Sequence, residues 1–245
     1  MNYFILALQF LTPIIGKCKI VKEEDLAKSM AWFSLAGLFI GIVLAGLYSL
    51  FILFLPQIVA CALILLATIL LSAGMHLDGL SDTVDGIAGG KDKKDALRIM
   101  HDSNIGAIGA VIVFSCLLIK FACLYSFSSH MTRLALIVAA VLSRWSFVFS
   151  AAKWQAAPDN QGLGKKFINF VTNEELLWAS LIMIAVLLAC FWIKGILILG
   201  LAILFIVGFN NFIKNKVGGL TGDTIGAVGE LTETLVLVLI AAIFR

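Results

Sequence analysis

Long apolar runs alternate with shorter polar segments along the whole 245-residue chain. An α-helix needs about 20 apolar residues to cross a bilayer. Runs near this length fall at residues 30–55, 57–77, 105–127, 134–152, 176–193, 196–213 and 224–244. The first apolar segment, residues 2–16, is shorter and predicts an interfacial or re-entrant helix. The pattern predicts an all-α, polytopic integral membrane protein with six or seven transmembrane helices in a single domain, residues 1–245.

The polar connections differ in length in a regular way. Long connections alternate with short ones, and the long ones cover residues 17–28, 78–104, 153–175 and 214–223. They hold 13 of the 18 Lys and Arg residues, and such an excess marks cytoplasmic loops. We therefore expect a multi-pass protein of the cell inner membrane whose long connections, and any active site that their charged residues form, face the cytoplasm.

Composition agrees with a lipid environment and narrows the choice of partners. Hydrophobic residues make up 61% of the chain and charged residues 13%. The mean hydropathy of +1.06 is far from that of a soluble globular domain. The net charge of +3 is too small to indicate nucleic-acid binding. The five cysteines are scattered without a C-x-x-C pair, which is typical of reduced packing residues.

Six aspartates lie between residues 74 and 103, directly after an apolar run. Asp78, Asp82 and Asp85 have the i, i+4, i+7 spacing that places side chains on one helical face. Carboxylates clustered beside hydrocarbon need a cation, and Mg²⁺ prefers carboxylate and phosphate oxygens. Zinc is less favoured, because the histidines, His76, His101 and His130, have no metal-like spacing with cysteine. A solvated cytoplasmic loop is the alternative interpretation.

A second helical pattern follows the glycine pair at residues 89–90. A helical hairpin at this pair would fold Asp102 back toward the other carboxylates. Asp92 and Asp95 alternate with lysines and predict a solvated, self-neutralised surface. These two aspartates are therefore not candidates for the site.

Residues 216–233 form a second polar cluster on the same predicted side. Its glycines, including Gly222, form a turn whose backbone amides could meet a phosphate. Asp223 and Glu230 are seven residues apart and share a helical face. Glu230 lies well inside the last apolar run, and an acid at that depth needs a cation or a substrate.

Basic residues within or beside the apolar runs are candidates for phosphate contacts. Arg144 lies in the middle of a run, where phosphate binding and a structural ion pair are equally open. Lys120 also lies within a run, and its long side chain is expected to snorkel to the interface. Lys165 and Lys166 belong to a predicted cytoplasmic loop that either contacts phosphate or anchors at the interface.

Four motifs together resemble the cobalamin-5′-phosphate synthase family, also called adenosylcobinamide-GDP ribazoletransferase. They are HLDGLSDTVDG at 76–86, RIMHDSNIGAIGA at 98–110, GLGKKF at 162–167 and GGLTGDTIGAVGE at 218–230. Two departures stand out. The family usually has Glu at the position of Arg98 and a basic residue at that of His101, and its FLTRLP-like signature reads FLTPIIG at residues 10–16.

The resemblance implies a membrane transferase of the last steps of vitamin B12 synthesis. In that reaction α-ribazole, or its 5′-phosphate, displaces GMP from adenosylcobinamide-GDP, with Mg²⁺ as cofactor. The implied metal ligands are Asp78, Asp82, Asp85 and Asp102, of which Asp82 and Asp102 are also the implied catalytic residues. Implied substrate-binding residues are His76, Ser103, Arg144, Lys165, Lys166, Gly222, Asp223 and Glu230. A homo-oligomer is possible, the lipid bilayer is the surrounding medium, and no nucleic acid is involved.

Two other functions remain open from the sequence. Asp82-x-x-Asp85-Gly86 is similar to the start of the CDP-alcohol phosphotransferase motif, whose aspartates hold a metal on a nucleoside diphosphate. A membrane phosphotransferase of phospholipid synthesis is therefore an alternative. A transporter would use acids at the ends of its spans, but the charges here gather on one side instead of near the bilayer midplane.

Overall fold

The structure, a computed structural model, describes residues 2–12, 16, 22–102, 104–158 and 168–244. No β-strand forms within these ranges, and a single isolated bridge joins Ala156 to Leu220. The all-α prediction is therefore confirmed. The helices are α1 (Tyr3–Leu11), α2 (Glu23–Ser29), η2 (Met30–Trp32), α3 (Phe33–Phe54), α4 (Gln57–Leu71), α5 (Met75–Gly89), α6 (Lys93–Met100), α7 (Ala107–Ser126), α8 (Ser129–Lys153), α10 (Asn173–Val217) and α11 (Gly222–Ile243).

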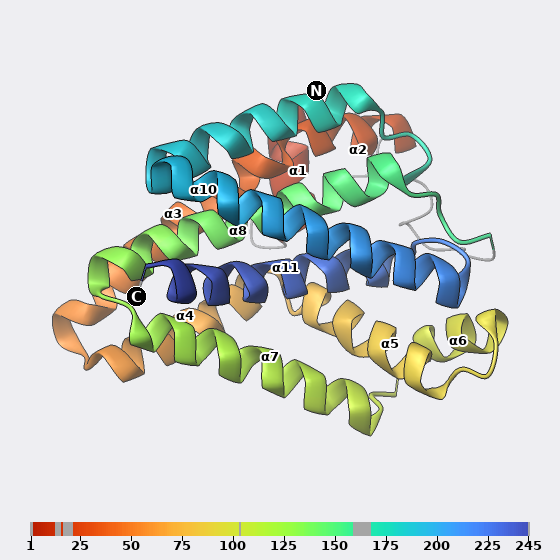
Figure 1. Cartoon of the computed structure of the whole chain (residues 1–245), viewed down its shortest axis with the longest axis horizontal. Coiled ribbons are helices and arrows are strands. Elements are labelled where there is room, and N and C mark those ends of the chain that lie inside the picture. The colour runs from red at the N-terminus through yellow and green to blue at the C-terminus, as the bar shows by residue number, and fades with distance from the viewer. Residues whose placement is uncertain (1, 13–15, 17–21, 103, 159–167, 245) are drawn as a thin grey trace.

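Five helical segments in the described part of the chain are long and apolar enough to cross a membrane. They are Glu23–Phe54, Ala107–Ser126, Ser129–Lys153, Asn173–Val217 and Gly222–Ile243, and the bent pair of α4 and α5 is long and apolar enough only when its two helices are taken together. The longest, α10, contains a non-helical residue at Trp192, with φ 50° and ψ −138°. Figure 1 shows α10 doubling back at this point. Its two halves therefore correspond to the predicted runs 176–193 and 196–213, and the multi-pass prediction is confirmed.

The prediction of one continuous helix over residues 57–77 is wrong. Helix α4 ends at Leu71, and α5 starts at Met75 after a bend of 83°. Ala73 and Gly74 adopt positive φ values of 50° and 72°, which reverse the backbone out of helical geometry. The break lies inside an apolar sequence, so hydropathy alone runs through it.

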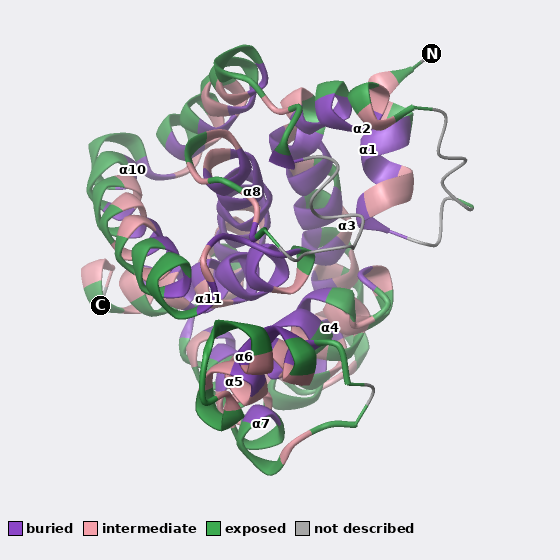
Figure 2. Cartoon of the chain, turned by 90° about the vertical axis from the view of Figure 1, so that its right-hand side faces the viewer, coloured by how far each residue is buried: buried purple, intermediate pink, exposed green. Residues whose placement is uncertain are grey.

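Helix α8 forms the centre of the bundle. In the most apolar stretch of α8, 83% is buried, whereas only 28% is buried in the corresponding stretches of α7 and α10. Figure 2 shows α8 surrounded by other helices, with mostly buried residues. Gly37 and Gly41 let α3 pack closely on α8, because a Cβ at either position would lie within 3.2 Å of α8 backbone atoms. The outer faces of α7 and α10, like the exposed apolar faces of α3 and α4, are therefore available to lipid.

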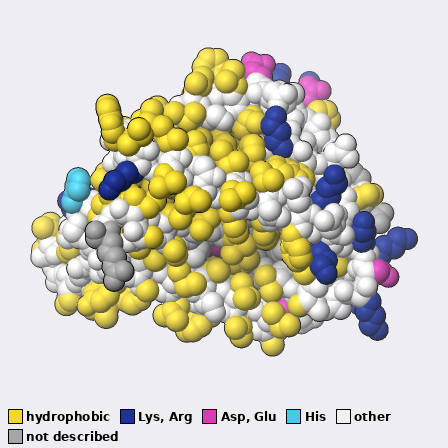
Figure 3. All heavy atoms as spheres, in the orientation of Figure 1, with side chains coloured by type: hydrophobic (Ala, Val, Ile, Leu, Met, Phe, Trp, Pro, Cys, Tyr) yellow, Lys and Arg dark blue, Asp and Glu magenta, His cyan; other side chains and the backbone are white. Residues whose placement is uncertain are grey.

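The two ends of the bundle differ as the sequence predicts. The turns between α3 and α4 and between α7 and α8, and the bend in α10, lie at one end in Figure 1. The ends of α5, α8 and α10 that lead into long connections lie at the other. Most charged side chains visible in Figure 3 also gather toward that second end, while hydrophobic side chains cover the middle of the face. One end of the bundle therefore carries most of the polar chemistry.

Candidate functional site

Helix α5 presents two carboxylates near the start of α11. Asp78 is exposed and Asp82 is half-buried, one turn apart on the helix. Between them Gly79 packs against α11, because a Cβ there would lie 2.8 Å from the backbone oxygen of Asp223. A side chain at position 79 would therefore push the two helices apart. The close approach brings Asp223 toward the carboxylates of α5.

Asp82 lies at the centre of a group of charged side chains. Asp82 is half-buried, and the charges of Asp78, Asp223, Asp85 and His101 all act on it. His101 and Asp78 also act on Asp223. Like charges at such positions repel each other unless a cation offsets them. We call Asp78, Asp82 and Asp223 the carboxylate face.

Asp85 shares the helix but has different partners. Its Oδ2 accepts a hydrogen bond from the backbone N–H of Gly106, and its Oδ1 accepts one from the N–H of Gly109, both at 2.8 Å. Gly106 is the N-cap residue of α7 and Gly109 lies in its first turn. The carboxylate of Asp85 therefore joins α5 to the start of α7.

Helix α6 and the residues after it lie at the same end of the bundle. Asp92 caps α6 by accepting a hydrogen bond from the N–H of Asp95 at 2.9 Å. Arg98 Nη2 pairs with Asp95 Oδ1 at 2.7 Å, and this hydrogen bond lowers the pKa of Asp95. The contacts of Asp92 and Asp95 therefore stabilise α6, as expected for aspartates outside the site.

Asp102 is exposed and is engaged locally. Its Oδ1 accepts hydrogen bonds from the backbone N–H of Asn104 at 3.1 Å and from Asn104 Nδ2 at 2.7 Å. These two bonds lower the pKa of Asp102. His101 Nδ1 lies 2.6 Å from the carbonyl oxygen of Leu97. Within the described ranges no three His, Cys, Asp or Glu side chains come together as metal ligands, so the predicted set of four aspartates is not assembled here.

Four charged side chains meet in the interior of the bundle. Lys120 of α7 pairs with Glu230 of α11, and its Nζ also lies 2.9 Å from Glu233 Oε1. Arg144 of α8 pairs with Glu233 Oε2 at 3.1 Å. All four side chains are buried. This buried ion cluster, with two positive and two negative side chains, is self-neutralised and ties α7, α8 and α11 together.

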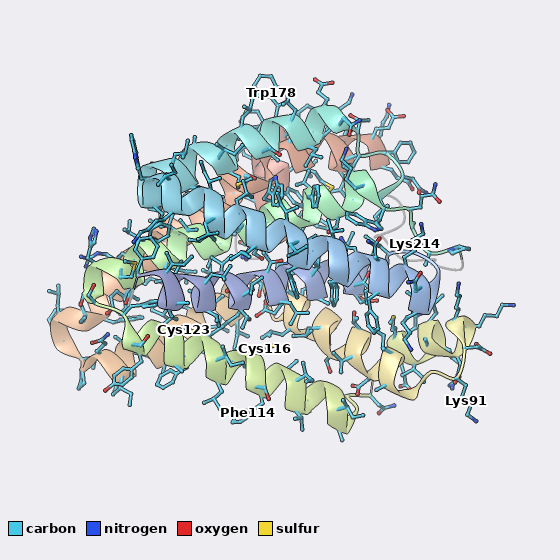
Figure 4. All side chains as sticks on the ribbon, viewed as in Figure 1. Lys91, Phe114, Cys116, Cys123, Trp178 and Lys214 are labelled. Carbon is cyan, nitrogen blue, oxygen red and sulfur yellow. The ribbon has the colours of Figure 1, made fainter. Side chains whose placement is uncertain are left out.

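The buried ion cluster contradicts the prediction for Lys120 and does not test the predicted substrate contacts of Arg144 and Glu230. Lys120 does not snorkel, because only 1% of its side chain is exposed and two carboxylates hold it inside. Figure 4 shows Cys116, one turn before Lys120, on the inner side of α7, while Phe114 points away. Arg144 and Glu230 belong to the cluster, and the structure does not bring them to the carboxylate face. The sequence does contain a signal for this cluster: Glu233 lies three residues after Glu230 within the same apolar run, so two buried acids on one helix face need basic partners.

The remaining candidates occupy several positions. His76 is buried at the start of α5, with its ring 4.9 Å from that of Phe147. Gly222 is exposed as the first residue of α11, and Thr221 caps this helix by accepting a hydrogen bond from the N–H of Thr224. Candidates outside the described residues are Ser103, Lys165 and Lys166.

The fold and the site define a multi-pass α-helical membrane protein with acidic chemistry at one end of its bundle. A family model described as cobalamin-5-phosphate synthase matches residues 3–241. The chain belongs to this family.

Curated relatives agree with the family assignment. Proteins named adenosylcobinamide-GDP ribazoletransferase from Desulforamulus reducens and Acetivibrio thermocellus are each 36% identical to this chain over 96% of its length. The matches cover 94% and 95% of those proteins. A protein of the same name from Geotalea daltonii is 34% identical over 98% of this chain and 97% of its own. No solved structure matches the chain significantly.

Proposed function

We propose that this protein transfers the adenosylcobinamide-phosphate group of adenosylcobinamide-GDP to α-ribazole or α-ribazole 5′-phosphate and releases GMP. Family membership and the names of the relatives support the reaction. The structural observation that carries the proposal is the approach of Asp223 to the face of α5 that bears Asp78 and Asp82. In that arrangement, carboxylates from two helices could hold a metal ion on the diphosphate of the donor and accept a proton from the attacking alcohol.

Mg²⁺ is the cofactor that this donor set fits. Asp78 is exposed and Asp82 half-buried, so neither side chain is closed off inside the bundle. Mg²⁺ in proteins commonly takes one or two carboxylates and completes its shell with substrate phosphate oxygens and water. We propose Asp78 and Asp82 as its protein ligands. Bound there, the ion would neutralise charge on the diphosphate.

The transfer needs one proton acceptor. A hydroxyl oxygen of the ribazole ribose forms a bond to the cobinamide-bearing phosphorus, and the bond from this phosphorus to the GMP oxygen breaks. The proton of the attacking hydroxyl passes to a base, and Asp223 is the proposed acceptor because it approaches the α5 face from another helix. Catalytic and metal-binding roles for Asp102 stay a prediction, as do substrate contacts of His76 and Gly222.

We also propose that the end carrying the long connections faces the cytoplasm of a bacterial inner membrane. The excess of Lys and Arg in those connections supports this orientation. Single cysteines at positions 92 and 130 provide the test, because Asp92 and His130 are both exposed. Asp92 precedes α6 at the end with the long connections, and His130 lies in the first turn of α8 at the opposite end of the bundle. The five native cysteines are first replaced by serine.

A membrane-impermeant maleimide applied to spheroplasts should label the His130→Cys variant and leave the Asp92→Cys variant unlabelled. Both variants should react after detergent solubilisation. Labelling of Asp92→Cys in intact spheroplasts would reverse the proposed orientation.

The nucleotide released identifies the donor. Purified protein is incubated with Mg²⁺ and either adenosylcobinamide-GDP with α-ribazole, or a CDP-alcohol with a lipid alcohol. We expect GMP release with the first pair and no CMP release with the second. CMP release alone would favour a phospholipid-type phosphotransferase and would contradict the proposal.

A further inference from the structure

The start of α7 is held by a side chain from another helix. The first N–H groups of any α-helix lack partners within the helix and need an acceptor from elsewhere. Gly106, the N-cap residue of α7, has no side chain to supply one. Asp85 supplies both oxygens across 21 and 24 residues of sequence, at 2.8 Å each. A carboxylate is a strong acceptor at this position, because it also meets the positive end of the helix dipole.

The carboxylate of Asp85 also explains why glycine stands at positions 106 and 109, at the start of α7. A Cβ at Gly106 would have three Asp85 carboxyl atoms as its nearest neighbours, all within 2.8 Å. A Cβ at Gly109 would meet Asp85 Oδ2 and the side chain and backbone oxygens of Ser81, also within 2.8 Å. Glycine at both positions therefore leaves the room that the Asp85 side chain occupies. The Gly-x-x-Gly spacing serves this contact between α5 and α7.

We infer that Asp85 is a positioning residue and not a metal ligand. Each of its oxygens already accepts a backbone hydrogen bond from the start of α7, whereas Asp78 is exposed and Asp82 lies close enough to Asp223 to be affected by its charge. Asp82 lies one turn before Asp85 on the same helix. By tying α5 to α7, Asp85 keeps Asp82 turned toward Asp223. This role rests on the proposed function, but the contact itself does not.

A double-mutant cycle between Asp85 and Gly106 tests the contact without any assay of activity. Thermal unfolding is measured for purified wild-type protein, Gly106→Ala, Asp85→Ala and the double variant. Gly106→Ala should lower the unfolding midpoint by about 5 °C, because its methyl group displaces the carboxylate. In the Asp85→Ala background the same change should cost much less, since the atoms it would strike are gone.

Gly41→Ala is the matched control for this cycle. Its Cβ would strike the backbone of α8 and none of the atoms of Asp85. Its cost should therefore be the same with and without Asp85→Ala. Equal costs of Gly106→Ala in both backgrounds would overturn the inference. If Asp85→Ala does not fold, Asp85→Ser replaces it: its side chain keeps one heavy atom beyond Cβ in place of three, so a partial reduction in the cost of Gly106→Ala is expected.

The Mg²⁺ requirement separates positioning from metal binding. Asp82→Asn should raise the Mg²⁺ concentration for half-maximal GMP release by about tenfold or more, or abolish release. Asp85→Asn should lower the maximal rate and raise that concentration much less than Asp82→Asn does, because both oxygens of Asp85 hold the start of α7. An equal rise in both variants would show that Asp85 binds the metal. If wild-type protein releases no GMP, the proposed function fails, while the unfolding cycle still decides the role of Asp85.

Discussion

Replacing Asp82 by Asn should lower the rate of GMP release by about a hundredfold or more while the protein stays folded. The change removes the charge that would face the donor diphosphate and retains the shape of the side chain. Stability should not fall, because a neutral amide is easier to bury than a carboxylate and does not repel the neighbouring carboxylates of Asp78, Asp223 and Asp85. The measurements are the rate of α-ribazole-dependent GMP release and the midpoint of thermal unfolding for the same preparation.

Asp92→Asn is the matched control for Asp82→Asn. Asp92 is also an aspartate near the end of the bundle, but it is exposed and caps α6. Asparagine is an equally good helix cap, so this variant should keep the wild-type rate. A rate for Asp82→Asn within about threefold of wild type would contradict the assignment of Asp82 to the site.

Replacing Lys120 by Met should cause the largest loss of stability of any change described. The cluster would then hold two buried carboxylates, Glu230 and Glu233, with Arg144 as the remaining partner. Removing one partner of a buried ion pair costs about 3 to 5 kcal/mol, because the other charge is left uncompensated. In a chain of this size the unfolding midpoint should fall by about 10 °C. Thermal unfolding in detergent measures the effect.

A second substitution should reverse most of that loss. In the double variant Lys120→Met, Glu230→Gln the surviving pair of Arg144 and Glu233 is again neutral, so the buried charges balance. Lys194→Met is the control, because Lys194 is exposed and lies over the ring of Phe244 at 4.6 Å. That contact is worth at most about 1 kcal/mol. If Lys120→Met were no more destabilising than Lys194→Met, the cluster would not be a structural element.

The hydropathy pattern predicted most of the fold, because the length of an apolar run and its alternation with polar loops are local properties. The pattern even separated the two halves of α10, although the chain turns at Trp192 and not at Lys194, the charged residue between the two predicted runs. The break between α4 and α5 was missed. Ser72, Ala73 and Gly74 do not lower hydropathy enough to interrupt the run, and only backbone conformation marks the bend.

The site was harder to predict, because its partners are distant in sequence. Lys120 has the pattern of a snorkelling lysine when its own helix is considered alone, and its acidic partners lie 110 and 113 residues away. The spacing of Asp82 and Asp85 likewise suits two metal ligands. Only the position of Gly106 and Gly109 against α5 separates the two aspartates. The carboxylate pattern itself, Asp78 with Asp82 on one helical face, was predictable from a period of 3.6 residues.

The most direct test of the proposed transfer is a balance of products from purified protein in lipid vesicles. Adenosylcobinamide-GDP, Mg²⁺ and labelled α-ribazole are supplied, and both GMP and the label attached to corrinoid are counted. We expect one labelled corrinoid for each GMP released, and no GMP when α-ribazole is left out. GMP released at the same rate without α-ribazole, with no label transferred, would show hydrolysis of the donor and would contradict the account.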